Sequence, residues 1–589
     1  MACGVCKTVR YEAEARNESN GEVVESAELI RICVTGTFSR IRKPTLMMKK
    51  SAAIHLAKIM RSEAQRAMSQ IRGGEHPRPF YVSFLTRDEE IWEISASYGS
   101  LLNDKYERRR SCFCDVRVGS HRHDQVQDGG LHDNSKEDDS YQYIDIPFGA
   151  SESGIRHGLW RQAEVRYREA VEAMAAKKSH ALTYLDRNSK LPSFQKLPGI
   201  ERTMWRKLPE VDVRFWQSFV TKSSALVCDY LAVKESNVRF HVLNQVRVFV
   251  NTEGSLIVQC QPYWTLSCHL WMLSDQGDAL TWTINHFVAD PEDLPDARRF
   301  RKELRETIGT LQQLAVAPPL RSYAGPVLLD PVPAGLLIHE ALGHRIEANR
   351  LLSTGEAQTF RDSLHKRILP DYLTIEDDPS LDRFQGMSLV GHYLFDDEGV
   401  PARNADLVSQ GVLQGFLTSR AGITPKHRSN GHGRNERYER TISRMAVTKV
   451  TSHDGLTDAR MKKRLIEEVQ RQKLPYGIRI LSATGGETAT ETYNFQAFLG
   501  EINLATRVYP DGREELIRGV DFVGTPLNAT RTIIAAGSRY EVDNAYCGAE
   551  SGWVPISTIS PSLLISHLEL QSKADMPYSQ PCYPIPWGK

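Results

Sequence analysis

The sequence predicts an α+β protein with two structured domains, and three observations support this class. Helical and strand-like segments occur in separate runs rather than in strict alternation. The strand-like segments are joined by short turns, which is typical of antiparallel pairing. Apolar residues make up 41% and charged residues 25% of the 589 residues, a balance that excludes a disordered or fibrous chain.

We divide the chain into three parts. Residues 1–46 have no sustained periodicity and are predicted to be a flexible extension or an over-called N-terminus. Residues 47–320 are predicted to form an N-terminal domain that mixes helices with an antiparallel sheet. The composition changes after Pro318 and Pro319, so residues 321–589 are predicted to form a mostly antiparallel β domain that carries one metal-binding helix.

The N-terminal domain shows clear periodic patterns. Apolar residues at helical spacing predict helices over 51–71, 159–184 and 298–314. Alternating segments at 238–251, 255–266 and 280–287 predict an antiparallel meander.

Two further segments of this domain lead to more local predictions. The apolar segments on either side of residues 86–90 (TRDEE) predict a hairpin in which TRDEE is the turn. Residues 112–142 are rich in Asp, Ser, His and Gly and are predicted to form a long exposed loop.

Net charge and apolar content predict the cellular location of the protein and whether it binds nucleic acid or membranes. The formal net charge is +1, so no global field draws the chain to nucleic acid, and direct nucleic-acid binding is not expected. No stretch has the roughly 18 consecutive apolar residues of a membrane-spanning helix, and the N-terminus lacks an apolar leader. We therefore expect a cytoplasmic protein that does not bind membranes.

The ten cysteines are irregularly spaced, which indicates free thiols in a reducing compartment. Cys3 and Cys6 form a C-x-x-C pair, but no second pair follows at zinc-finger spacing. A second group of possible ligands contains Cys112, Cys114, His121, His123 and His132. For that group a solvated loop is the favoured interpretation and adventitious metal binding the alternative.

The segment 334–350 (AGLLIHEALGHRIEANR) contains His339, Glu340 and His344. In the zinc metallopeptidase pattern H-E-x-x-H, the histidines lie four residues apart on one helix face, and the glutamate is the general base. Here one more residue separates them, which places the rings about 140° apart on a regular α-helix. Shared metal binding therefore requires a π-type turn or a break near Gly343. The alternative is a straight helix with only one histidine facing the cleft.

A third ligand is needed for a metal site, and Cys547 in the segment NAYCGAESGW is the candidate. A lone cysteine beside a glycine-rich turn is more often an inert apolar residue, and that alternative stays open.

Together these segments resemble the TldD/PmbA metallopeptidase family. The similarity includes HEALGH, the late Y-C-G segment, residues 391–419 with their D-D-E-G turn and G-V-L-Q-G-F, the N-G-H-G-R segment at 429–445, and the glycine-rich segment 485–498. These motifs occur in one order between about residues 325 and 567. The match over residues 50–320 depends only on position and α+β character.

The resemblance implies a function and a set of site residues. The H-E-x-x-x-H motif is that of the catalytic TldD type, in which His339 and His344 bind the metal, Glu340 is the general base and Cys547 is the third ligand. It implies one Zn²⁺ per chain and a peptidase that hydrolyses unfolded or extended polypeptides by metal-activated water. It also implies either a homodimer or a heterodimer with a motif-lacking paralogue.

One segment departs from the family pattern. Where small residues and an acid are expected, in the manner of G-L-E-G-D, the chain has Arg-Ile-Glu-Ala-Asn at 345–349. Glu347 is kept and is predicted to orient His344, with a surface salt bridge as the alternative. The larger side chains are predicted to narrow the cleft.

Donors for the oxyanion or the substrate are expected from the glycine-rich segment. The candidates are His432, Arg434 and Tyr438, and the alternative is an ordinary positively charged loop. Two other functions stay open. The first is a noncatalytic partner or regulatory subunit of a TldD/PmbA-like complex. The second is a metal-dependent hydrolase of nonpeptide amides or esters.

Overall fold

A computed structural model describes residues 48–71, 74–131, 145–149, 151–183, 190–353, 358–488, 490, 498–573 and 586. The chain divides after Met47, and everything below concerns the second unit. The predictions for residues 1–46, including Cys3 and Cys6, lie outside the described residues, as does His132.

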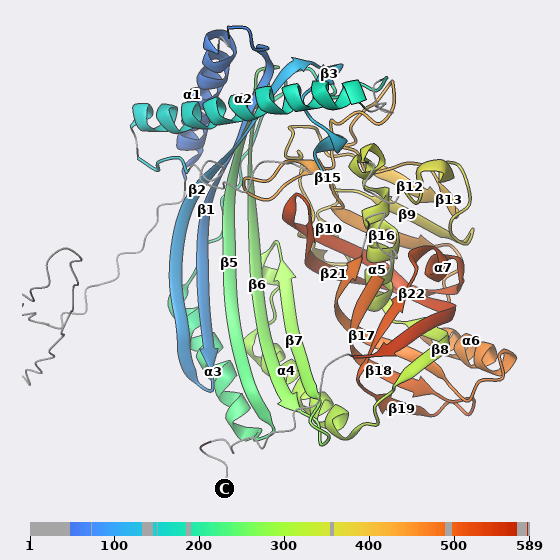
Figure 1. The fold of residues 1–589 in the computed structure, drawn as a ribbon. Coiled ribbons are helices and arrows are strands. Elements are labelled where there is room, and N and C mark those ends of the chain that lie inside the picture. Colours follow the sequence, from blue (N-terminus) through green and yellow to red (C-terminus); the bar gives the residue numbers. More distant parts are fainter. Residues whose placement is uncertain are drawn as a thin grey trace, which may run out of the picture. The chain divides into compact units, whose positions relative to one another are not determined.

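The N-terminal half contains a sheet of long antiparallel strands (Figure 1). Its strands are β1 (Pro79–Ser97), β2 (Ser100–Ser120), β3 (His123–Asp124), β4 (Glu201–Met204), β5 (Val233–Asn251), β6 (Leu256–Leu273) and β7 (Ala279–Val288). The order is β3-β2-β1-β5-β6-β4, and β7 also pairs with β6. The predicted meander is confirmed as β5, β6 and β7, which pair in sequence.

The hairpin predicted around TRDEE is wrong, because residues 86–90 lie in the middle of the uninterrupted strand β1. Asp88 and Glu89 are buried there but face arginines of β2. Asp88 accepts a hydrogen bond from Arg110 at 2.8 Å, and Glu89 pairs with Arg109. The charged residues Asp88 and Glu89 suggested a turn, but they are buried in a strand because arginines of the neighbouring strand pair with them.

The loop predicted over 112–142 is also wrong in its first part, because β2 extends to Ser120. Cys112 and Cys114 lie two residues apart on one face of β2 and are fully buried. Burial raises the pKa of both thiols. His121 and His123 lie beyond the strand, so this stretch gathers no metal-binding cluster among the described residues.

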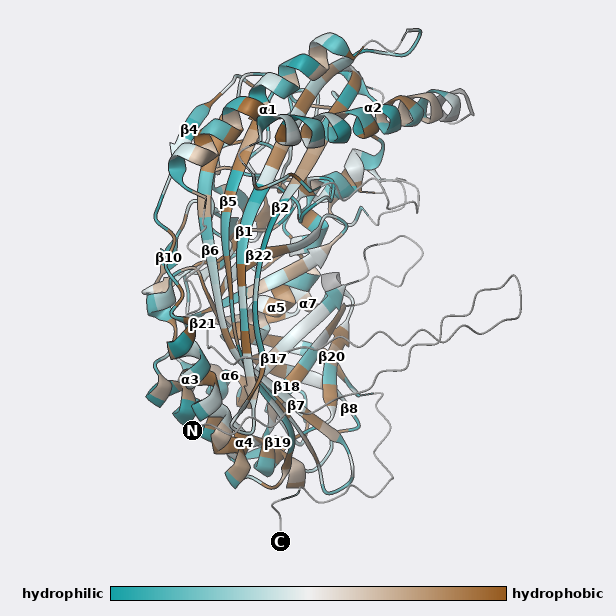
Figure 2. Cartoon of the chain, turned by 90° about the vertical axis from the view of Figure 1, so that its left-hand side faces the viewer, coloured by the Kyte–Doolittle hydropathy of each residue, from teal (hydrophilic) through white to brown (hydrophobic). Residues whose placement is uncertain are grey.

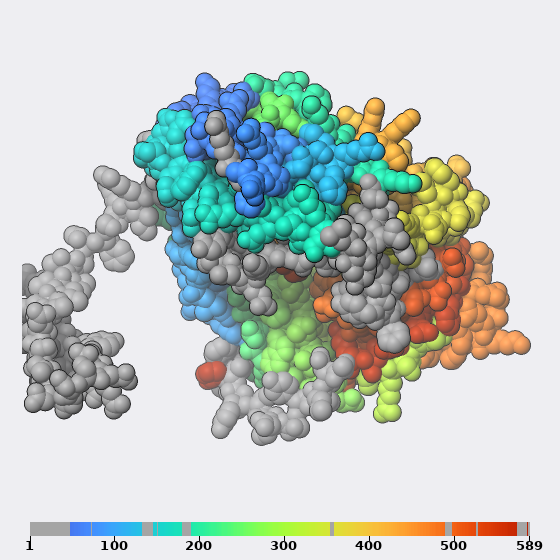
Figure 3. Space-filling model, turned by 45° about the horizontal axis from the view of Figure 1, so that its top comes forward, coloured from blue at the N-terminus to red at the C-terminus, as the bar shows by residue number. Residues whose placement is uncertain are grey.

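Helices cover both ends of this sheet. They are α1 (Lys50–Gln70), α2 (Glu152–Thr183), α3 (Val213–Ser224) and α4 (Ala297–Val316). Figure 2 shows α1 and α2 across one end of the long strands, and α1 buries a stripe that includes Leu56, Met60 and Ala64. In Figure 3 this end, blue to cyan, lies beside the yellow and orange surface of the C-terminal half. A hydrogen bond from Asn349 to the carbonyl of Gly129 joins the two surfaces.

The described part of the C-terminal half contains a mostly antiparallel sheet of eleven strands. They are β8 (Ser322–Leu329), β9 (Leu373–Asp377), β12 (Ala405–Ser409), β13 (Val412–Leu413), β16 (Val447–Ser452), β17 (Gly477–Thr488), β18 (Phe498–Val508), β19 (Glu514–Ile517), β20 (Val520–Gly524), β21 (Ile533–Ala549) and β22 (Gly552–Ser572). Two small ribbons pair β10 (Arg383–Phe384) with β11 (Met387–Ser388) and β14 (Gly433–Arg434) with β15 (Ile442–Ser443). Strand β8 pairs with both β17 and β22, which closes the path β22-β20-β18-β17-β8 into a ring.

Among the described residues, the α-helices that accompany this sheet are α5 (Pro331–Ala341), α6 (Asp458–Arg471) and α7 (Pro526–Arg531). Helix α5 follows directly on β8, and Leu337 and Ile338 belong to the main core of this half, together with side chains of β8, β17, β18 and β22. An element fixed between so many strands is a rigid support for functional side chains.

The observed helices and largely antiparallel sheets confirm the predicted α+β class. The boundaries at 47 and 321 stay predictions. Among the described residues, no helix combines the length and apolar character needed to cross a membrane.

Candidate metal centre

The two histidines of the H-E-x-x-x-H segment lie on opposite sides of a helix break. Helix α5 ends at Ala341, Leu342 has φ −120° and ψ −50°, and a 3₁₀ turn follows over Gly343–Ile346. Shared metal binding would require a break near Gly343, and the structure has one in the form of a 3₁₀ turn, so the alternative of a straight helix is wrong. The ring centroids of His339 and His344 are 4.9 Å apart.

Gly343 is required by the crowding at this break. A Cβ at this position would stand 2.1 Å from Sδ of Met445. Since real side chains do not approach so closely, any larger residue would displace either Met445 or the turn that carries His344.

Cys547 joins the two histidines from a distant part of the chain. It lies near the end of β21, beside the turn into β22, and its Sγ is 3.4 Å from Nε2 of His344. One donor atom from each of His339, His344 and Cys547 lies within 4.8 Å of the others, and all three residues are buried. This is the one such group found among the residues that the structure describes.

The electrostatics of this cluster favour a bound cation. Burial would raise the pKa of the Cys547 thiol, but the charges of His344, Arg444 and His339 outweigh it and hold that pKa well below its usual value. Burial would lower the pKa of His344, but the charges of Cys547 and Glu347 raise it to about 10. Imidazoles that hold a proton so tightly lie in a negative potential, which also attracts a metal ion.

The donor set fits zinc. Two imidazoles and one thiolate are borderline-soft ligands of the kind that zinc binds, and three protein ligands leave a fourth position open, as in catalytic sites. In addition, the buried Nδ1 of His339 has no hydrogen-bond partner. A bound metal ion would coordinate ligand atoms that are not all engaged in hydrogen bonds within the protein.

Glu347 lies behind His344 rather than at the surface. Its Oε2 is 3.3 Å from Nδ1 of His344 and 3.3 Å from Nη2 of Arg350. Burial would raise the pKa of Glu347, but the charges of His344, Arg350 and Arg444 lower it to about 2. Such a carboxylate fixes the ring orientation of a ligand histidine.

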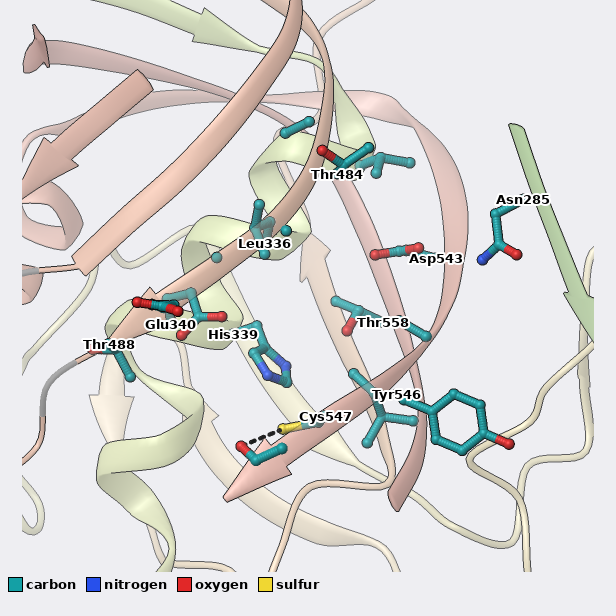
Figure 4. Close-up of a pocket in the computed structure, with 18 of the residues that line it drawn as sticks. Asn285, Leu336, His339, Glu340, Thr484, Thr488, Asp543, Tyr546, Cys547 and Thr558 are labelled. Carbon is teal, nitrogen blue, oxygen red and sulfur yellow. Dashed lines mark hydrogen bonds between the residues drawn. The ribbon is translucent and has the colours of Figure 1, made fainter. Parts of the chain in front are cut away.

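Glu340 lies on α5 and faces the same space as His339 (Figure 4). Its side chain packs against Gly486 of β17, where a Cβ would stand 2.9 Å from Cγ of Glu340. Arg345 contacts both of these elements, because its Nη1 donates to the carbonyl of Glu340 on α5 and to Oγ1 of Thr488 on β17, both at 2.7 Å. The unexpected arginine after the motif is therefore buried and holds α5 to β17.

His339, Glu340, His344 and Cys547 line a cleft of about 1470 Å³. Its walls come from α5, β17 and β21, and β7 and α4 of the N-terminal half close its far side. Tyr546 stacks on Phe287 at 4.8 Å, and the amide of Asn544 donates to the carbonyl of Phe287 at 2.8 Å. Both halves of the chain therefore shape the site.

His432, Arg434 and Tyr438 do not line this cleft. His432 is fully buried against Asp377, and Arg434 donates to the carbonyls of Met445 and Pro555. Tyr438 donates to Asp145 at 2.6 Å. The structure thus does not bring them together with the donor cluster.

Arg444 was not predicted as a site residue, although its Nη2 lies 3.1 Å from Sγ of Cys547. No local sequence signal identifies it, since its partner is 103 residues away. Arg444 does lie within residues 429–445, the segment that resembles the family's N-G-x-G-R segment.

Comparison with known proteins is consistent with this geometry. Residues 322–572 match the family described as the PmbA/TldA metallopeptidase C-terminal domain. A metalloprotease of Archaeoglobus fulgidus is 31% identical over 252 residues, which are 42% of this chain and 53% of that protein. A metalloprotease of Methanothermobacter thermautotrophicus is 26% identical over 490 residues, which are 80% of this chain and 98% of that protein.

A solved structure has the same fold. TldE from Thermococcus kodakarensis superposes with a TM-score of 0.57 at 13% identity, over 88% of this chain and all of that one. This superposition shows a shared fold, and the sequence match shows the similarity of residues 322–572 to a metallopeptidase C-terminal domain. Residues 322–572 therefore resemble the TldD/PmbA family in sequence.

Proposed function

We propose that this chain is a zinc-dependent peptidase of the catalytic TldD type that hydrolyses peptide bonds of unfolded or extended polypeptides. The observation that carries the proposal is the position of His339, His344 and Cys547, which lie within 4.8 Å of one another beside Glu340 at the cleft. His339 and His344 would hold the zinc together with Cys547, one ion per chain.

Zinc bound there would supply a Lewis acid and a water of lowered pKa. Glu340 would accept the proton of the attacking water and return it to the leaving amine. Glu347 would keep the His344 ring in place through Nδ1. Arg345 would hold the backbone of Glu340 through its carbonyl.

The preference for extended substrates is supported by the edge of β17. This strand pairs with β8 only from Ile478 to Ile480. From Ser482 to Thr488 it lines the cleft and, among the described residues, pairs with β18 on one side alone. A free edge can add an extended peptide as a further strand, which a compact domain cannot offer.

The two other functions differ from this proposal in their predictions. A noncatalytic partner subunit has no need of a complete donor cluster with a glutamate beside it, and the presence of both favours the enzyme. A hydrolase of nonpeptide amides would use the same donors, so only a comparison of substrates separates it. We further propose that the chain works as a homodimer or as a heterodimer with a motif-lacking paralogue.

The test uses the full chain loaded with zinc. We expect cleavage of an unstructured fluorogenic peptide and of a denatured domain, but not of the same domain when folded. Cleavage should stop on chelation and in Glu340→Gln. Failure of the zinc-loaded chain to cleave any peptide, alone or mixed with a motif-lacking paralogue, would overturn the proposal, as would faster hydrolysis of nonpeptide amides.

A further inference from the structure

The cleft has an excess of negative charge. Its lining includes the carboxylates of Glu303, Glu340, Glu487, Asp543 and Glu550. Among its described lining residues, Arg350 is the one arginine or lysine, and it is already paired with Glu347 and Glu550. The charge of the wall therefore favours positively charged ligands.

Among these carboxylates, that of Asp543 has a position in the cleft that can be related to the metal centre. It lies on β21 four residues before Cys547, so both side chains project from the same face of the strand. Four residues of extended strand span about 13 Å. Figure 4 shows its carboxylate in the space between Thr484 of β17 and Asn285 of β7, on the side of the cleft away from Cys547.

The surroundings of Asp543 leave its charge uncompensated. It is partly buried and has no hydrogen bond or ion pair with any residue that the structure describes. Burial raises the pKa of this carboxyl, and the charge of His339 opposes that effect. A carboxylate withdrawn from water without a cation is unfavourable, so a cationic partner that enters the cleft would gain from pairing with it.

The neighbouring side chains can complete such a site. Asn285 faces Asp543 across the cleft, and Oδ1 of the lining residue Asn503 accepts a hydrogen bond from Thr484 at 3.1 Å. An amide oxygen has two acceptor sites, so these asparagines can add an acceptor to the carboxylate of Asp543 for an ammonium or guanidinium group, which has several donors to satisfy.

We propose that Asp543 determines substrate specificity by binding a positively charged nitrogen of the polypeptide, either a Lys or Arg side chain or the N-terminal ammonium. The inference depends on the proposed function, because it assigns a substrate class to the same cleft. For an extended substrate, the distance from Cys547 places the charged group up to about four residues from the scissile bond.

The test measures binding rather than turnover. Zinc-loaded full chain carrying Glu340→Gln is titrated with labelled unstructured peptides that have one Lys or one Gln at each position in turn. A second pair of peptides, with free and acetylated N-termini, separates the two sources of the charge. We expect the Lys peptide, or the free N-terminus, to bind about tenfold more tightly than its neutral match.

Variants then assign the effect to one residue. Asp543→Asn should remove the preference and Asp543→Glu should retain most of it. Asp406→Asn, the same change at an exposed position on β12, should leave it unchanged. Equal affinity for charged and neutral peptides would overturn the inference, and so would a preference that persists in Asp543→Asn.

Failure of the inference can be distinguished from failure of the proposed function. If peptides are cleaved but bind regardless of charge, only the role of Asp543 is lost. If charged peptides bind through Asp543 but the chain with Glu340 intact cleaves none, the peptidase proposal is lost and this inference stands. If Asp543→Asn does not fold, the affinities of the Lys and Gln peptides are compared in the parent and in Asp543→Glu instead. Equal affinities for the two peptides in both proteins would refute the inference.

Discussion

Arg444 lies with its Nη2 3.1 Å from Sγ of Cys547 and 2.7 Å from the carbonyl of the same residue. It is fully buried and also donates to Ser551 and to the carbonyl of Gly552. One guanidinium therefore holds the turn between β21 and β22 and the thiol beside it.

Arg444→Gln should destabilise the protein strongly. The change leaves Glu347 and several backbone acceptors without this partner, and loss of one member of a buried ionic network costs about 3 kcal/mol or more of unfolding free energy. Denaturant titration measures the change, with Arg403→Gln at an exposed position as the control. Equal stability of the two variants would show that Arg444 does not hold this turn.

Cys547→Ala should lose most of the bound zinc. Without the thiolate only two imidazoles remain, fewer than the three protein ligands of catalytic zinc sites. Elemental analysis of purified protein measures the occupancy. The matched control is Cys228→Ala, which changes a partly exposed cysteine outside the cluster and should retain the metal. Full occupancy in Cys547→Ala would remove Cys547 from the proposed ligands.

Glu340→Gln should keep its zinc and fold but lose hydrolysis by at least about 10²-fold, since the isosteric amide cannot accept the proton of water. The measurement is kcat/KM on an unstructured peptide. A near-normal rate would refute the general-base role of Glu340. Glu501→Gln on β18 is the control, because that exposed residue does not line the cleft.

Gly343→Ala should destabilise the protein by about 1–3 kcal/mol, because the added methyl overlaps Sδ of Met445. The double variant Gly343→Ala/Met445→Ala should lose less than the sum of the two single changes, since the smaller residue at 445 makes room. Denaturant titration of the four proteins gives the coupling energy. Strict additivity would mean that the two residues do not restrict each other.

Glu398 should make stability depend on pH. Burial and the neighbouring Asp396 raise its pKa above the ordinary value of 4.5. The folded state then holds the proton more tightly than the unfolded chain. This contribution to stability is fully present below pH 4.5 and is lost as the pH rises through the raised pKa.

Glu398→Gln imitates the protonated form and should escape this loss. Its unfolding free energy relative to the parent should therefore rise by at least about 1 kcal/mol between acid and mildly alkaline pH. Denaturant titrations across that range measure the difference. A difference that does not change with pH would refute the raised pKa.

The sequence predicted those parts of the fold that depend on local periodicity. The helical stripe of α1 and the turns of the β5-β6-β7 meander are local signals, and both were predicted correctly. The charged residues 86–90 of β1 were assigned to a turn, because the arginines that compensate them lie about 20 residues away on β2. Helix α6 was missed, since Met461, Leu465 and Val469 are few among many charges.

In the candidate site, too, local features were predicted from the sequence and long-range contacts were not. The spacing of His339 and His344 predicted a helix break on the condition that both bind one metal ion, which is a local consequence of geometry. Cys547 was a candidate third ligand from its segment, but only the family resemblance favoured it over an inert cysteine. The contacts of Arg444 with Cys547 and of Arg345 with Thr488 join residues 103 and 143 positions apart, and no periodicity reports such contacts.

X-ray absorption at the zinc edge of the full chain, loaded with one equivalent of the metal, tests the central claim most directly. The account predicts two nitrogen neighbours at about 2.0–2.1 Å, one sulfur at about 2.3 Å and one further light atom, with the sulfur contribution lost in Cys547→Ala. A zinc shell made only of oxygen and nitrogen in the parent protein would contradict it.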